Sequence, residues 1–472
     1  MGSTGHSGWC LMLGIGWTEG GEMLEAGKQI VGYWWNPSTP EKQYFGILKK
    51  FDDSVRLDIV FSQSQILAME QQSFINGFND NYLPVIHGCC GGASRKEYSL
   101  INATINSNEY PDFFTFSFGN LPVHVSQIYE GIYIKDLEEN FISSAIIRTN
   151  YLSEWIPPPT IKESYCEAEN SFNLRYSNKS NDYNLFEDEK TIIKFSSYLS
   201  GSKNLGNNFS YTIFNDATIN INSKEKLSYK SFSLYLFKIK TFLWLLMGKA
   251  NIISDIKFCY LIDAEQEIPS EIWIRNDIVE ENNNKPLFSF ESIKDLQNKF
   301  TQWSDFIDSN FDTIKMLMQI IERPSTFFAD RKTENLVQIF EALSDFIIGK
   351  DIPIGDSYFK FIVTDSDAIK KYDKKKTSPV LISKLAYFFW EKHFDLFESD
   401  FDYIYGTHDE SKIKDFLSNA KDIRVKYSHG GKEKNITLKP ECINVILYKG
   451  IRFILLHDIL GIEIENIRME SI

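Results

Sequence analysis

The chain has 472 residues, of which 43% are hydrophobic and 24% are charged, as in folded globular proteins with room for two or three domains. Its formal net charge of −14 excludes a broad, nonspecific attraction to nucleic acid, so any such contact requires a local basic patch. Aromatic residues reach 15%, which favours strand-rich, well-packed structure over disorder.

The cysteines and the apolar stretches indicate the compartment. None of the six cysteines has the paired spacing of zinc ligands. His87 lies near Cys89 and Cys90, and this segment fits a strand and turn with reduced cysteines better than a metal site. No basic segment followed by a long apolar run marks a signal peptide, and the most apolar stretch, Thr241–Met247, is too short to span a bilayer. We therefore predict a cytoplasmic protein with no membrane association, no metal and no cofactor.

The first two thirds of the chain are predicted to be rich in strands. Residues 1–29 are Gly-rich and irregular, whereas residues 55–61 alternate apolar and polar side chains and form a hairpin with residues 44–48. One helix interrupts this pattern, because apolar residues recur at helical spacing from Phe232 to Leu246 and Gly248 follows as a terminator. Further strands are expected at residues 83–86, 113–118, 123–125, 128–134, 172–176, 191–195, 209–214, 256–262 and 271–275.

The last third is predicted to be helical. A polar linker with a terminal proline, Val279–Pro286, separates the two parts, and beyond it the apolar period changes from two to 3.6. Five helices are expected, around residues 300–321, 336–346, 381–393, 416–428 and 443–460. The predicted domains are thus residues 1–29, an irregular extension, residues 30–285, rich in strands, and residues 286–472, a helical bundle.

The fourth of these helices carries the candidate site. Phe416, Ala420, Ile423 and Tyr427 recur at helical spacing, and Gly430-Gly431 ends the segment. Arg424 and His429 would lie about 140° apart on an unbroken helix, so we expect the helix to end near Ser428 and His429 to fold back beside Arg424. The surrounding basic residues would suit a phosphodiester: Lys421, Lys426, Lys432 and Lys434.

A second pair with the same spacing, Arg452 and His457, serves as an internal control. Apolar residues fill the interval between the two side chains, and no helix breaker occurs before Gly461. We therefore predict that this pair is structural.

The run from Lys421 to His429, followed by a polar linker and an apolar helix ending at Ile462, resembles the HEPN domain of ApeA-type anti-phage proteins. The Trp-rich opening strands, the many short strands and the helix ending at Gly248 resemble the N-terminal domain of the same proteins. The resemblance implies an α+β multidomain chain, with a β-rich sensor or regulatory domain followed by an all-α HEPN helical bundle.

The resemblance also implies an activity. An R-x4–6-H motif is the catalytic signature of HEPN endoribonucleases, which implies metal-independent RNA cleavage with Arg424 and His429 as catalytic residues and Lys421, Lys426, Tyr427, Lys432 and Lys434 as RNA-binding residues. HEPN enzymes with one motif per chain build the site from two copies, which implies a homodimer, and a phage-derived trigger of unknown identity would act on the N-terminal domain.

Two alternatives remain open. Val425 stands where Asn often follows the motif arginine. This departure is compatible with a non-catalytic HEPN module for interaction or dimerisation, joined to a ligand-sensing β domain. The run Tyr33-Trp34-Trp35 suggests the other alternative, a carbohydrate- or nucleotide-binding β domain. Exposed tryptophans would favour this hypothesis.

Overall fold

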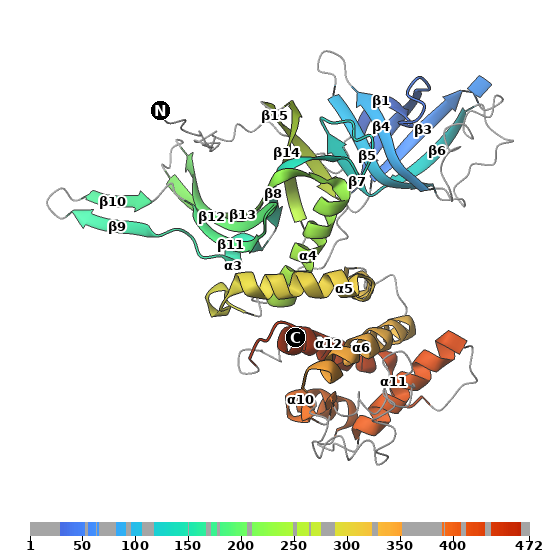
Figure 1. Ribbon diagram of the computed structural model, residues 1–472, viewed down its shortest axis with the longest axis vertical. Helices are drawn as coiled ribbons and strands as arrows, with labels where there is room; N and C mark the ends of the chain where they lie inside the picture. Colours follow the sequence, from blue (N-terminus) through green and yellow to red (C-terminus); the bar gives the residue numbers. More distant parts are fainter. Residues whose placement is uncertain are drawn as a thin grey trace, which may run out of the picture. The chain divides into compact units, whose positions relative to one another are not determined.

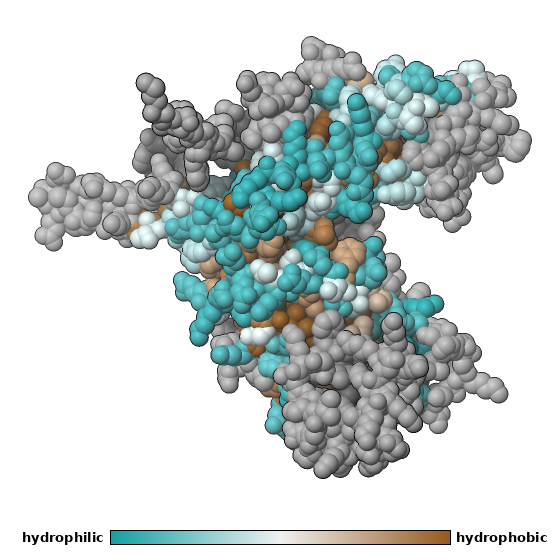
Figure 2. All heavy atoms as spheres, in the orientation of Figure 1, coloured by the Kyte–Doolittle hydropathy of each residue, from teal (hydrophilic) through white to brown (hydrophobic). Residues whose placement is uncertain are grey.

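The computed structural model shows a strand-rich N-terminal part followed by helices, which confirms the predicted order (Figure 1). It describes residues 29–51, 55–62, 64–65, 82–90, 96–105, 118–149, 151–166, 171–176, 180–204, 210–248, 253–263, 266–274, 288–322, 329–351, 389–390, 392–406, 412–429 and 436–463. On the face shown in Figure 2, these residues are mainly hydrophilic, with hydrophobic residues gathered in separate patches. None of the helices in this part of the chain combines the length and apolar character needed to cross a bilayer.

The chain forms two compact units. Unit 1 comprises Met1–Asp136 and Ser270–Asn276, and unit 2 comprises Leu137–Pro269 and Asp277–Ile472. This division differs from the boundary predicted at residues 285 and 286, because part of the strand-rich region shares a unit with the C-terminal helices. The predicted extension, residues 1–29, and the predicted linker, Val279–Pro286, lie outside the described residues except for Gln29.

Unit 1 contains a closed antiparallel barrel of six strands. They are β1 (Gln29–Trp35), β2 (Tyr44–Lys50), β3 (Val55–Ser62), β4 (Tyr82–Cys90), β5 (Lys96–Ile105) and β6 (Phe118–Val125). They follow the order β5-β4-β1-β2-β3-β6, and β6 pairs back with β5 where Thr104 faces His124. Closure leaves few unpaired backbone groups at strand edges. Outside the ring, β7 (Gln127–Glu130) pairs with β5 and with the last residues of β15 (Gln266–Ile274).

Trp34 fills the interior of this barrel. Its side chain is fully buried, and Nε1 donates a hydrogen bond to the carbonyl of Gly46 at 3.2 Å. Gly88 lies opposite Trp34 in the register, and a Cβ there would come within 2.1 Å of the indole ring. Glycine at position 88 therefore creates the space for Trp34. Trp35 is also buried, so both tryptophans belong to the core, and the exposed tryptophans that would favour a carbohydrate- or nucleotide-binding domain are not found.

The strands of unit 2 form a sheet in the order β11-β12-β13-β8-β14, and the helix α4 (Tyr229–Met247) follows directly after β13. Ser228 caps its first turn by accepting a hydrogen bond from the backbone N–H of Ser231, and Gly248 ends it at φ 77°. The remaining elements are β8 (Asn140–Thr149), α3 (Leu152–Trp155), β9 (Ile161–Cys166), β10 (Ser171–Tyr176), β11 (Asn181–Glu187), β12 (Thr191–Asn204), β13 (Ser210–Ser228) and β14 (Ile253–Asp263).

The C-terminal helices pack against α4, which explains why unit 2 includes both. The buried Lys238 of α4 contacts Ser304 and Asp308 of α5 at 2.9 and 2.7 Å, and Trp303 Nε1 donates to the Lys238 carbonyl at 3.2 Å. The helices are α5 (Leu296–Glu322), α6 (Ala329–Asp351), α10 (Phe394–Tyr405), α11 (Lys412–His429) and α12 (Pro440–Ile454), after which Leu455–Ile459 form a π-helical turn.

Most of the predicted strands and helices coincide with observed elements. The helix at residues 232–246 is confirmed as α4, and the predicted helices at 300–321, 336–346, 416–428 and 443–460 fall on α5, α6, α11 and α12 with its π-helical turn. Residues 113–117 and 381–388, assigned to a strand and to the third helix, lie outside the described residues. The helix α10, which begins directly after His393, was not predicted.

Candidate active site

The helix α11 carries the motif, and three residues of its predicted apolar stripe are buried. Phe416, Ala420 and Ile423 are at most 3% exposed, as is Ile413 one turn earlier, whereas the side chain of Tyr427 lies outside the described part. Phe416 lies edge-on to Trp390, with 5.4 Å between the ring centroids. Because these residues follow a 3.6 period, burial of the stripe fixes the rotation of α11 about its own axis.

The helix extends one residue further than expected and includes His429. Arg424 and His429 therefore share one helix, where five residues correspond to about 140° of rotation and about 7.5 Å of rise. The observed end of the helix thus lies within one residue of the end predicted near Ser428. Arg424 is half-buried, whereas the imidazole of His429 lies outside the described side chains. How the two side chains meet stays a prediction.

The structure describes two of the five predicted RNA-binding side chains. Lys421 is exposed and Lys426 is half-buried, and both lie within five residues of Arg424 on α11. The side chain of Tyr427 lies outside the described part, as do Lys432 and Lys434. These two lysines thus lie on the two turns of α11 that lead to His429.

Asn419 fixes the chain on both sides of the motif. Its side chain is 5% exposed, and Nδ2 donates to the carbonyl of Asp415 at 2.8 Å. Its Oδ1 accepts from the backbone N–H groups of Thr437 and Leu438, at 2.8 and 3.2 Å. One side chain therefore ties the chain that returns after His429 to the helix that carries Arg424. The sequence alone does not predict this role, because Asn is common at helix positions between the apolar and the polar face.

Arg452, the first residue of the control pair, is structural. It is 1% exposed, and its Nη2 donates to the carbonyls of Trp244 and Leu245 at 3.2 and 2.9 Å. Both acceptors belong to the last turn of α4, where the helix presents partial negative charge. The guanidinium also lies 5.3 Å from the centroid of Trp244. Arg452 thus joins α12 to the end of α4.

His457 belongs to a small cluster with another histidine. Its Nδ1 lies 2.8 Å from a carboxylate oxygen of Asp458, and its ring stacks on Phe453. His393 is 7% exposed and contacts the same Phe453, with 4.8 Å between the centroids. Burial, assisted by the positive charge of Lys392, lowers the pKa of His393 to about 4. Packing against Phe453 supports the structural interpretation of His457, and it assigns His393 to the core as well.

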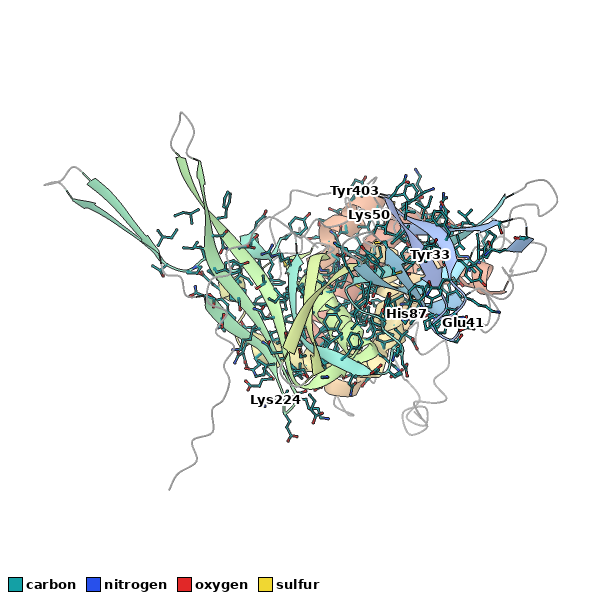
Figure 3. All side chains as sticks on the ribbon, turned by 90° about the horizontal axis from the view of Figure 1, so that it is seen from above. Tyr33, Glu41, Lys50, His87, Lys224 and Tyr403 are labelled. Atoms are coloured by element: carbon teal, nitrogen blue, oxygen red, sulfur yellow. The ribbon has the colours of Figure 1, made fainter. Side chains whose placement is uncertain are left out.

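No group of three His, Cys, Asp or Glu side chains within the described ranges is arranged to hold a metal ion. His87, which lies two residues before Cys89, is buried, and its Nε2 lies 2.8 Å from the carbonyl of Ile134. Burial lowers the pKa of His87, so the neutral imidazole is favoured. His87 is accordingly a packed histidine of unit 1, on β4 (Figure 3).

Comparison with known proteins identifies the N-terminal part of the chain. The family model of the ApeA N-terminal domain 1 matches residues 29–303, more than half of the 472 residues. The match begins at β1 and ends within α5, so it spans all the strands that the structure describes. No curated protein and no solved structure gave a match.

Proposed function

This chain belongs to the family of the ApeA N-terminal domain 1, and on that premise we propose that it is an anti-phage defence protein with a HEPN ribonuclease in its C-terminal helices. The observation that carries the proposal is the placement of Arg424 and His429 in the last two turns of α11. The apolar side of this helix is buried and the chain after it is anchored through Asn419.

The proposed reaction is the attack of a ribose 2′-OH on its own phosphate. His429 acts as the general acid or base, because the ordinary pKa of histidine lies near neutrality. Arg424 stabilises the additional negative charge on the pentacoordinate phosphate. The reaction requires no metal, and its products are a 2′,3′-cyclic phosphate and a 5′-hydroxyl.

We further propose that the site is composed of residues from two copies of the chain. Within one helix, Arg424 and His429 are separated by about 140° and about 7.5 Å, which is unfavourable for joint contact with one phosphate. Two α11 helices related by a two-fold axis would bring Arg424 of one copy near His429 of the other.

Mixing two inactive variants tests this arrangement. If each site takes Arg424 from one copy and His429 from the other, a mixture of Arg424→Ala and His429→Ala chains forms heterodimers with one intact site and one doubly altered site. RNA cleavage then returns in the mixture although each variant alone is inactive. Two variants that form heterodimers without regaining cleavage would show that each site uses one chain.

The alternative is a non-catalytic HEPN module that binds a partner or a second copy, which Val425 in place of the usual Asn favours. Under that alternative, Arg424→Ala and His429→Ala leave any RNA cleavage by the preparation unchanged. The role proposed for the β-rich region is to restrain the nuclease until a phage-derived trigger is present.

A further inference from the structure

The outer face of the barrel in unit 1 carries an exposed aromatic pair. Tyr33 on β1 is 53% exposed and Phe45 on β2 is 42% exposed. They are direct neighbours in the strand register, and their rings meet edge to face with 6.2 Å between the centroids. Tyr33 is labelled in Figure 3. The next outward pair, Val31 and Ile47, extends the apolar surface, and Val31 is 51% exposed.

A row of cations crosses the same face. Lys49 on β2 faces Arg56 on β3 and lies four residues along the strand from Phe45, or about 13 Å at the rise of a β-strand. Lys49 Nζ lies 2.7 Å from Oδ2 of Asp58, and Arg56 Nε lies 2.8 Å from Oδ1 of the same carboxylate. One buried carboxylate thus orients two cations and neutralises only one of them.

A further aromatic ring lies beside this row. The Arg56 guanidinium lies 5.7 Å from the centroid of Phe51, whose side chain is 42% exposed. Flat aromatic rings beside oriented cations are the elements with which proteins hold single-stranded nucleic acid, because bases stack on the rings and phosphates contact the cations. Because the chain carries a net charge of −14, contact with a polyanion requires such a local group of cations.

We propose that this face of β1, β2 and β3 binds single-stranded nucleic acid, with bases stacked on Tyr33 and Phe45 and phosphates held by Lys49 and Arg56. A protein partner would also cover the apolar pair. However, two cations held by one carboxylate on the same face, four residues along β2 from Phe45, favour a polyanion that carries planar groups. The site lies within unit 1 and does not depend on the proposed nuclease.

Binding of fluorescein-labelled oligodeoxythymidylate of 20 residues to the full chain provides the test. This probe has no 2′-OH, so its binding can be measured by fluorescence anisotropy whether or not the protein cleaves RNA. Tyr33→Ala and Phe45→Ala should each weaken binding about tenfold, since stacking of one base contributes a factor of this order. Tyr403→Ala is the matched control, because Tyr403 is 87% exposed on α10 in unit 2.

The salt dependence tests the cationic row separately. Two phosphate contacts predict a slope of about −1.4 in a plot of log K against log salt concentration, and Lys49→Gln should reduce its magnitude by about 0.7. An oligouridylate of the same length in the His429→Ala background shows whether RNA binds as DNA does. Two results would overturn the proposal: no binding at low salt, or binding that the Tyr33 and Phe45 variants weaken no more than the Tyr403 control.

Discussion

The arginines of the two Arg–His pairs should differ strongly in how much stability the same substitution removes. Arg452→Ala removes a buried guanidinium that donates to two carbonyls at the end of α4, and it leaves the carbonyl of Leu245 without that donor. A hydrogen bond from a charged donor contributes about 1.5–3 kcal/mol, so the variant should lose about 3–5 kcal/mol of unfolding free energy. Arg424 is half-buried on α11, and Arg424→Ala should cost about 1 kcal/mol or less.

Urea denaturation of the full chain, followed by tryptophan fluorescence, measures this contrast. With an m-value of about 3 kcal/mol/M, Arg452→Ala should lower the midpoint of the unit 2 transition by more than about 1 M. Arg424→Ala should remain close to the wild-type midpoint. Equal midpoints for the two variants would refute the assignment of Arg452 as the residue that joins α12 to α4.

Four further predictions concern unit 2. Asn419→Ala should cost about 2 kcal/mol and speed hydrogen exchange at the two backbone amides that Asn419 holds; protection equal to wild type would contradict the anchor. His457→Gln should lower thermal stability yet leave RNA cleavage intact at matched folded concentration, and lost cleavage would move the catalytic assignment to the second pair. Because burial lowers the pKa of His393 from 6.5 to about 4, the unfolded state binds more protons between these values, so stability should fall as the pH is lowered from 6.5 towards 4; His393→Leu should reduce this pH dependence of the urea midpoint. A fragment of residues 137–472 should unfold cooperatively, and it should be toxic in cells if unit 1 restrains the nuclease. A fragment of residues 286–472 should aggregate, because α4 is missing. A soluble fragment 286–472 beside an aggregating fragment 137–472 would contradict the packing of the C-terminal helices against α4.

Local patterns predicted the elements well where one periodicity dominated. The spacing of Phe232, Leu236 and Ile239 predicted α4, and all three side chains are buried in the structure. The helix α10 was missed because its buried residues Phe394 and Phe397 lie among acidic residues, directly after a segment already assigned to a helix. Pattern alone could not show where one helix ended and the next began.

Long-range contacts could not be predicted in the same way. The closure of the barrel rests on two pairings between β5 and β6, and no local pattern encodes them. The shared unit of strands and helices rests on contacts such as Arg452 with Trp244, which are 208 residues apart. The spacing of Arg424 and His429 was enough to identify the candidate motif. The anchoring role of Asn419, in contrast, depends on the chain returning to α11 at Thr437.

Cleavage of RNA by the purified 472-residue chain, compared between wild type and His429→Ala, is the most direct test of the proposed nuclease. Loss of the general acid or base should slow cleavage by about 10²–10⁴-fold at matched folded concentration. Arg424→Ala should cost on the order of 3–4 kcal/mol of transition-state stabilisation, and the double variant should lose little more than the worse single variant. The account predicts that wild-type cleavage persists in EDTA and leaves a 2′,3′-cyclic phosphate. Undiminished cleavage by folded His429→Ala protein would contradict it.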